Sequence, residues 1–224
     1  MYTPPMFKTD RAASLAFAEA RGFGIACAWD GKRPIASALP FYLDYAEDGT
    51  PTALFHVARN NALIKAADSV TPWVLAVTGA DAYVTPDWYV SADQVPTWLY
   101  QAVHLTGPVR TLSEAELVVQ IDTLSAKFEN RLLPKKPWTL GKMTAARLEA
   151  LKKGIVGLSM RGEDVEGSFK LNQQKSEADY AAVANGLAAM PDHGSQTIAQ
   201  LMRETRPQAF ATMTDKTASL EGSM

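Results

Sequence analysis

The sequence predicts a mainly β protein in which an antiparallel sheet closes into a barrel and helices lie at its periphery. In the first half of the chain about six short apolar segments follow one another with turns between them, a pattern typical of antiparallel sheets and barrels. A single small helical turn interrupts these segments, so repeated strand–helix–strand units are disfavoured. Capped amphipathic helices are concentrated in the second half of the chain.

A first helix is predicted close to the N-terminus, over residues 10–21. Thr9 is suited to cap it, because a threonine hydroxyl can accept a hydrogen bond from a free N–H of the first turn. Leu15 and Phe17 supply apolar contacts, and Gly22 is expected to end the helix.

A β-hairpin is predicted after this helix. Residues 23–29 and 34–43 are its strands, and Asp30–Gly31 form its turn. A polar loop follows the hairpin, and a short helical turn is expected within residues 59–68. The further strands predicted in this half of the chain are 52–58, 72–79, Ala82–Thr85 and Trp98–Arg110.

The second half of the chain carries clear helix signals. Ser113 and Glu116 have the spacing of a capping box, in which each residue satisfies a free N–H of the other. Apolar residues then recur every three or four positions on one helix face, namely Leu117, Ile121, Leu124 and Phe128. The remaining expected elements are a helix opened by Thr144, a returning strand over 154–162, a strand or exit loop over 167–174, and a helix capped at Ser176 and Asp179.

These elements predict one domain over residues 1–190, made of the barrel and its flanking helices. Residues 191–224 are expected to form a helical extension that ends in a mobile tail after Pro207, where apolar periodicity is lost.

Composition and motifs exclude several classes of protein. The chain has 224 residues, a net charge of -2 and one cysteine, Cys27, which fits a soluble protein of the reducing cytoplasm. No apolar run approaches the length of a membrane span, and the N-terminus does not resemble a signal peptide. The three histidines, His56, His104 and His193, are far apart, so no metal site is predicted.

The stretch from Asp81 to Gly107 combines aromatic and polar residues. It holds two of the five tryptophans and three of the seven tyrosines. Such residues usually pack in a core, but a flat apolar wall with a few polar groups also suits a planar heteroaromatic ligand. Both interpretations stay open from the residues alone.

Several motifs occur in a fixed order along residues 1 to about 190 and carry a family resemblance. They are MYTPPMF at the start, His56–Asn61, Ala82–Tyr89, Val95–His104, Ile155–Gly157 and Phe169–Ser176. With these motifs the chain resembles the PaiB family, FMN-binding proteins of the flavin split-barrel (pyridoxine-phosphate oxidase-like) superfamily that are often labelled negative transcriptional regulators.

The resemblance implies a six-stranded antiparallel split barrel of Greek-key type, homodimerisation, and FMN held at the dimer interface. The chain departs from the family pattern at four positions. Leu99 stands where the family commonly has Asn, and Asn172, Gln174 and Lys175 replace the usual Ser, Asn and Arg. These departures bear on ligand contacts more than on the fold.

The phosphate side of the flavin site is expected where a strand meets a helical turn, since cationic and neutral donors occur there together. The candidates are His56, Arg59, Asn60 and Asn61. The resemblance implies that Arg59 and Asn61 match the family's phosphate-side motif. The alternatives are a surface salt bridge for Arg59 and a satisfied structural role for His56.

The ring side of the site is expected in the aromatic stretch and in the strand after it. The candidates are Tyr83, Thr85, Thr97, Trp98, Gln101, His104 and, from the partner subunit, Lys170. The alternatives are core or dimer-interface aromatics and a surface lysine. Gln101 and His104 have spacings that resemble two arginines of pyridoxine-phosphate oxidases, so that enzyme's phosphorylated substrate is not expected here.

A basic region over residues 127–153 suggests a possible DNA contact. It holds eight Lys or Arg against Glu129 and Glu149, a local charge of +6, which could follow a phosphate backbone. The alternative is a solvated loop and helix face.

The function predicted from the resemblance is an FMN-binding homodimer that acts as a transcriptional regulator or flavin-dependent sensor. The alternatives are an FMN-dependent oxidoreductase and a haem-handling split barrel that uses His104 or His193. No acid, base or nucleophile pair stands out, so no catalytic residue is assigned.

Overall fold

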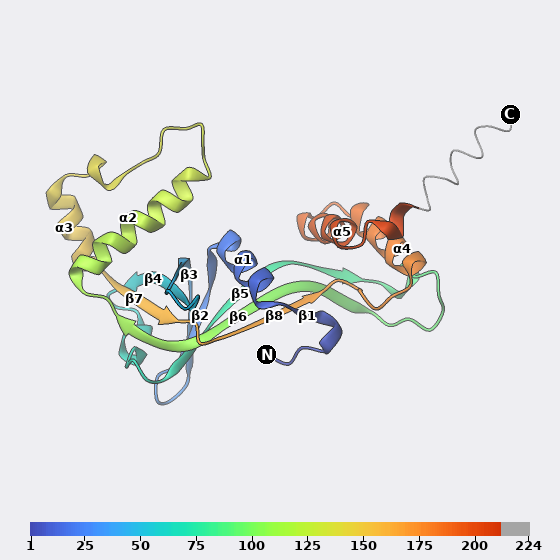
Figure 1. Cartoon of the computed structure of the whole chain (residues 1–224), viewed down its shortest axis with the longest axis horizontal. Coiled ribbons are helices and arrows are strands. Elements are labelled where there is room, and N and C mark those ends of the chain that lie inside the picture. Colours follow the sequence, from blue (N-terminus) through green and yellow to red (C-terminus); the bar gives the residue numbers. More distant parts are fainter. Residues whose placement is uncertain (212–224) are drawn as a thin grey trace. The chain divides into compact units, whose positions relative to one another are not determined.

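The structure, a computed structural model, describes residues 1–211 of the chain (Figure 1). Its strands are β1 (Lys8–Thr9), β2 (Phe23–Trp29), β3 (Pro34–Tyr45), β4 (Pro51–Ala58), β5 (Pro72–Val84), β6 (Thr97–Thr111), β7 (Ile155–Arg161) and β8 (Asp164–Lys170). Its α-helices are α1 (Arg11–Arg21), α2 (Glu114–Asn130), α3 (Ala145–Gly154), α4 (Glu177–Ala188) and α5 (His193–Thr205). Four short 3-10 helices are η1 (Pro5–Phe7), η2 (Ala62–Ala66), η3 (Pro86–Trp88) and η4 (Leu140–Lys142).

The eight strands form one sheet in the order β1-β8-β6-β5-β2-β3-β4-β7. An additional pairing between β6 and β7 closes six of them, β6-β5-β2-β3-β4-β7, into a ring. The neighbours with a defined register are antiparallel. The predicted six-stranded antiparallel barrel with peripheral helices is therefore confirmed.

The chain divides into two compact units. The barrel unit comprises residues 11–77 and 103–166, and the terminal unit comprises residues 1–10, 78–102 and the chain from 167 onward. Strands β5, β6 and β8 contribute residues to both units.

In the barrel unit, alternation along the strands separates the core from the outer face. Phe41, Phe55 and Leu158 are fully buried, whereas the residues beside them in the chain point outward, as the two-residue period of a strand requires. Helix α2 covers part of the outer face over β4 and β7 (Figure 1). Its capping box at Ser113 and Glu116 is present as predicted.

In the terminal unit, α4 and α5 pack on one face of the strand ends. Val84 and Leu99 meet Tyr180, Ile198 and other side chains of the two helices in an apolar cluster. Adjacent strand residues such as Tyr83 and Trp98 therefore lie on the opposite, exposed face.

Three sequence expectations about elements are wrong in detail. Thr9 lies in β1, and α1 begins at Arg11. Ala82–Thr85 is not a separate strand, because β5 runs without a break from Pro72 to Val84, although its buried positions change from odd to even numbers between Val77 and Ala82. After Pro207 the chain stays packed as far as it is described, with Ala209 buried and the Phe210 ring 6.3 Å from that of Tyr180. The rest of the predicted mobile tail, 212–224, lies outside the described residues.

No helix within residues 1–211 combines the length and apolar character needed to cross a membrane. The predicted domain limit at residue 190 and the cytoplasmic location stay predictions.

The β6–β7 closure depends on Gly107. A Cβ atom at this position would lie 1.6 Å from the carbonyl oxygen of Arg161, a backbone atom that cannot move aside independently. We expect Gly107→Ala to lower the free energy of unfolding by about 3 kcal/mol or more, which corresponds to a fall of roughly 6–12 °C in melting temperature. Thermal unfolding followed by circular dichroism measures this.

Gly154→Ala is the matched control, because a Cβ there meets nothing within 4 Å. Equal melting temperatures for Gly107→Ala and Gly154→Ala would show that the two strands separate at Gly107 without cost.

Candidate functional site

The barrel unit carries a hollow of about 650 Å³ at the turn between β2 and β3 and the connection from β4 to η2. We call it the cationic hollow. Its lining residues are Asp30, Lys32, Arg33, Arg59, Asn60, Asn61, Ala62, Ile64 and Lys65. Four of these side chains are cationic and one is anionic, so the hollow favours an anionic ligand.

The single carboxylate of the hollow is engaged by its own turn. Oδ1 of Asp30 accepts hydrogen bonds from the backbone N–H groups of Lys32 and Arg33, each at 2.9 Å. These bonds, that from Arg33 first, hold the pKa of Asp30 below its ordinary value. The Arg33 side chain is 77% exposed, and its Nε lies 3.8 Å from Asp30, so most of its donors remain available.

Asn61 fixes the connection from β4 to η2. Its side-chain oxygen accepts from the backbone N–H of Leu63 at 3.0 Å, and its Nδ2 donates to Oγ of Ser37 at 2.9 Å. Asn60 is exposed beside it. The local sequence thus places one fixed and one free amide at the edge of the hollow.

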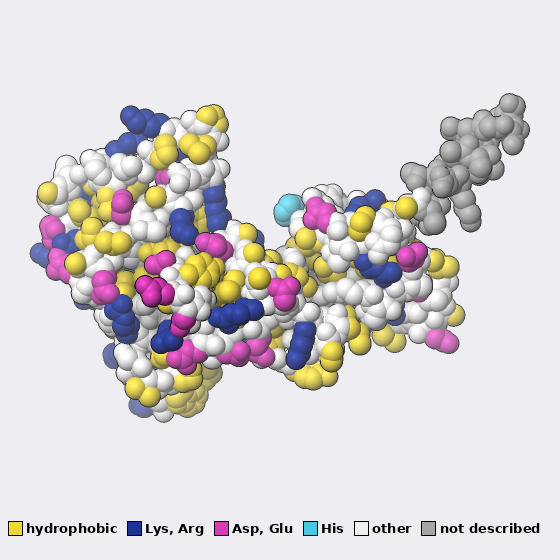
Figure 2. Space-filling view, in the orientation of Figure 1, with side chains coloured by type: hydrophobic (Ala, Val, Ile, Leu, Met, Phe, Trp, Pro, Cys, Tyr) yellow, Lys and Arg dark blue, Asp and Glu magenta, His cyan; other side chains and the backbone are white. Residues whose placement is uncertain are grey.

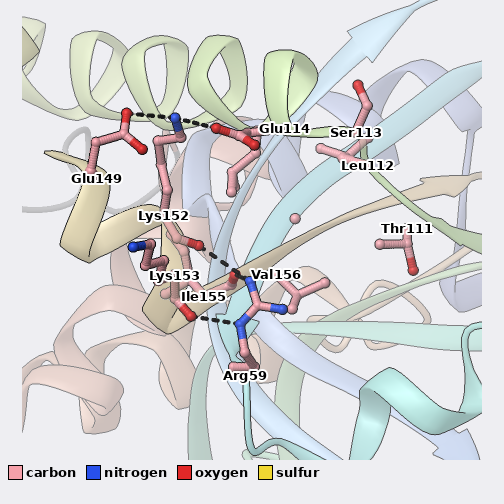
Figure 3. Close-up of a pocket in the computed structure, with 12 residues that line it drawn as sticks. Arg59, Thr111, Leu112, Ser113, Glu114, Glu149, Lys152, Lys153, Ile155 and Val156 are labelled. Atoms are coloured by element: carbon pink, nitrogen blue, oxygen red, sulfur yellow. Dashed lines mark hydrogen bonds and ion pairs between the residues drawn. The ribbon is translucent and has the colours of Figure 1, made fainter.

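Arg59 binds the end of α3 through its guanidinium group. Nε donates to the carbonyl of Lys153 at 2.6 Å, and Nη2 donates to the carbonyls of Lys152 at 3.3 Å and Ile155 at 3.0 Å (Figure 3). The last carbonyls of a helix lack partners within it and carry partial negative charge. Arg59 is therefore held as a helix cap rather than in the surface salt bridge considered from the sequence.

A second cavity of about 250 Å³ lies on the other side of this cap, between the start of α2 and the end of α3. Nζ of Lys152 forms ion pairs there with Glu149 at 2.7 Å and with Glu114 (Figure 3). These two carboxylates neutralise the charge of Lys152. The cavity therefore fits a structural role, which is to hold α3 in place.

His56 lies under α2 and does not line the cationic hollow. Its Nδ1 is 3.2 Å from Oε1 of Gln120, because the alternation of β4 turns His56 outward while Phe55 enters the core. Burial lowers the pKa of His56, and the hydrogen bond with Gln120 partly opposes this. The contact is the satisfied histidine considered as the alternative.

The terminal unit brings two pairs of predicted residues together. The rings of Tyr83 and Trp98 meet edge to face at 6.0 Å, and both side chains are about half exposed. Nζ of Lys170 donates to Oγ1 of Thr97 at 2.6 Å. Both pairs form within one chain, and the contribution of Lys170 to the site of the partner subunit stays a prediction.

The other predicted residues are placed as follows. Thr85 caps η3 by accepting from the backbone N–H of Asp87 at 3.4 Å, and Gln101 is buried. His104 belongs to the barrel unit, and burial lowers its pKa.

The motif after β8 fixes the segment 89–94. Nδ2 of Asn172 donates to the hydroxyl of Tyr89 at 3.1 Å, and Nζ of Lys175 donates to Oε1 of Gln94 at 2.5 Å. The buried carboxylate of Asp179 accepts from Ser91 N–H at 2.9 Å and Ser91 Oγ at 2.7 Å. Sequence reasoning assigned Asp179 only to a helix start and missed this role.

Of the eleven predicted site residues, Arg59, Asn60 and Asn61 line the cationic hollow. Lys32 and Arg33 line it too and were missed. The sequence does show two adjacent cations in the turn Asp30-Gly31-Lys32-Arg33. It does not show that this turn lies beside the end of β4, because that proximity arises only in the folded protein.

The basic region 127–153 is partly neutralised. Lys127 pairs with Glu19 at 3.0 Å, Lys135 with Glu129 at 2.5 Å, and Lys152 with two carboxylates. On the face drawn in Figure 2, Lys and Arg side chains of the barrel unit are interspersed with Asp and Glu. Contact of this region with DNA stays a prediction.

Comparison with known proteins finds a matching family model and several proteins of similar sequence. The family model described as "Putative FMN-binding domain" matches residues 1–164. "Protease synthase and sporulation protein PAI 2" of Bacillus subtilis (strain 168) is 30% identical over 205 residues, which cover 91% of this chain and 97% of that protein. An uncharacterized protein of Emericella nidulans is 28% identical over 135 residues, 54% of each chain.

Two solved structures share the fold. The FAD and heme binding protein from Mycobacterium smegmatis has a TM-score of 0.52 and 14% identity, over 72% of both chains. A conserved hypothetical protein from Mycobacterium tuberculosis has a TM-score of 0.51 and 10% identity, over 78% of this chain and 92% of that one. At these identities the similarity supports the fold alone.

The two shielded histidines of the barrel unit predict a pH dependence. Burial lowers the pKa of His56 and of His104 below the ordinary value of 6.5, so the unfolded chain binds protons more readily than the folded chain. The two neutral histidines therefore contribute to the free energy of unfolding at pH values above 6.5. This contribution is lost as the pH falls from the ordinary pKa of histidine toward the lower pKa values of the folded protein. We expect the melting temperature to fall between about pH 7.5 and pH 5.

The variant His56→Gln should show a smaller fall over the same range, measured by thermal unfolding. The control is Gly154→Ala, which removes no titratable group and meets nothing within 4 Å, and which should leave the pH dependence unchanged. An unaltered slope in His56→Gln would contradict the burial argument.

Proposed function

The chain belongs to the FMN-binding domain family, as the ordered motifs predict, and from this we propose that it binds FMN with the phosphate group in the cationic hollow. The observation that carries the proposal is the charge of the hollow, four cationic side chains against one carboxylate that its own turn engages.

The donors of the hollow fit a phosphate dianion. Arg33 and Lys65 offer charged N–H groups, and Asn60 offers an exposed amide. Hydrogen bonds between ionised partners are about twice as strong as neutral ones. Arg59 contributes charge, while its fixed hydrogen bonds to the α3 carbonyls make it the rigid wall of the site.

When bound, FMN would supply reversible one- and two-electron transfer, while the protein supplies binding and orientation. The ring-side contacts stay predictions for Tyr83, Thr85, Thr97, Trp98, Gln101, His104 and Lys170. The roles as transcriptional regulator, sensor, oxidoreductase or haem-handling protein stay predictions as well. Oxidation of NADH or NADPH by the FMN-loaded protein would favour the oxidoreductase.

The hollow predicts that affinity depends on the flavin's phosphate. We expect Arg33→Gln combined with Lys65→Gln to weaken FMN binding by at least about ten-fold, since charge-assisted hydrogen bonds are lost. Riboflavin, which has no phosphate, should bind the variant as it binds the wild type. Titration with quenching of flavin fluorescence measures both affinities.

Lys136→Gln is the matched control, because it removes a cation that does not line the hollow. Failure of the wild type to bind FMN would overturn the proposed function. An equal loss of FMN and riboflavin affinity in the double variant would instead show that the phosphate group does not bind in the cationic hollow.

We also propose that the protein is a homodimer through the outer face of β2. Phe23, Ile25 and Trp29 alternate on this face with exposures of 47%, 45% and 52%. Across from Ile25 lie Ala38 of β3 and Ala76 of β5. A contiguous apolar face on a soluble protein is typical of an interface.

This interface predicts a monomeric variant. Trp29→Asp places a charge in the apolar face and should convert the dimer to a monomer, because a buried unpaired charge is strongly unfavourable. Size-exclusion chromatography with light scattering at micromolar concentration measures the mass. Val119→Asp, on the exposed side of α2, is the control, and a monomeric wild type would contradict the proposal.

A further inference from the structure

The outer face of the barrel unit holds another polar hollow of about 340 Å³, which shares no lining residue with the two cavities described above. We call it the arginine–hydroxyl hollow. It is lined by Thr52, Ser69, Pro108, Val109, Arg110, Ser159 and Arg161. None of these residues lines the cationic hollow.

Strand register places four of its polar side chains on one face. Thr52 of β4 is opposite Arg161 of β7, and Arg110 of β6 is opposite Ser159 of β7. Ser159 and Arg161 are two residues apart on the same strand, so they share a face. The intervening Met160 is fully buried in the barrel, which directs the four polar side chains outward.

The hydroxyl groups in this hollow are free to bind a ligand. Among the described residues, no hydrogen bond is made by the hydroxyls of Thr52, Ser69 or Ser159. Ser159 is only 8% exposed and lines the hollow. The backbone of Ser69 adopts a φ of 66°, and its N–H donates to the carbonyl of Val109 at 3.0 Å. That bond holds Ser69 beside β6.

The two guanidinium groups differ in how firmly they are held. Arg110 binds Glu116 through both terminal nitrogens, at 3.2 and 2.7 Å. Arg161 lies 3.8 Å from Asp48, and both side chains are 60% exposed. An exposed pair at that distance contributes little. Arg161 can therefore turn its guanidinium to a ligand, while Arg110 stays in place with its Nε–H unused among the described residues.

From this arrangement we infer that the arginine–hydroxyl hollow binds the phosphate group of a small phosphorylated metabolite, at a site distinct from that proposed for FMN. A guanidinium fork matches the spacing of phosphate oxygens, and three hydroxyls supply further donors. The volume is at the lower end of small-molecule pockets, which suits a phosphate with a small attached group.

Inorganic phosphate is the probe, titrated into ¹⁵N-labelled full-length protein saturated with FMN, at constant ionic strength. Amide resonances of Thr52, Ser69 and Ser159 should shift in a saturable way. Arg161→Gln should weaken this binding about ten-fold or more, because a charged hydrogen bond is lost. Ser159→Ala should weaken it about three-fold, because a neutral hydrogen bond is lost. Lys136→Gln, which lines neither hollow, should leave the titration unchanged.

Non-saturating shifts would overturn the inference, as would shifts confined to residues 30–33 and 59–65. Unaltered binding by Arg161→Gln would overturn it too, provided that the resonances away from the hollow show a folded variant. Failure of the FMN proposal is read separately, from the flavin titration, because the phosphate titration can be repeated without FMN.

Discussion

The closure between β6 and β7 is the constraint on which the barrel unit depends. Pairing of Val109 with Met160 completes the ring of six strands, and Gly107 permits the backbones to meet where any side chain would clash. Once the ring is closed, each strand has one inner and one outer face. The same register that buries Met160 turns Ser159 and Arg161 outward.

Arg59 shows how far a sequence pattern can be followed. An arginine at the end of a strand, next to two asparagines, predicts an anion site, and the structure does place Arg59 in the cationic hollow. Its guanidinium group nevertheless binds carbonyls at the end of α3, which lie 94 and 96 residues later in the chain. The sequence contains no local sign of that contact, because it depends on the pairing of β4 with β7.

Features that depend on neighbouring residues were predicted well, because the interactions that form them act within one turn or one strand. The caps at Ser113, Thr144 and Ser176 are present, and so is the β2–β3 hairpin. Long-range contacts were not predicted. Lys32 and Arg33 join the hollow only because the hairpin turn lies beside the β4–η2 connection, and Asp179 receives Ser91 from a loop 88 residues away in the chain.

Charge distribution links the two hollows to the fold. A chain with a net charge of -2 does not attract anions as a whole, so anion binding must come from cations gathered locally. Turn chemistry gathers Lys32 and Arg33 while occupying the nearby carboxylate of Asp30. Strand register gathers Arg110 and Arg161 on the barrel's outer face. In both hollows the local backbone geometry decides which cationic side chains remain available to bind an anion. The same geometry decides which residues line each hollow.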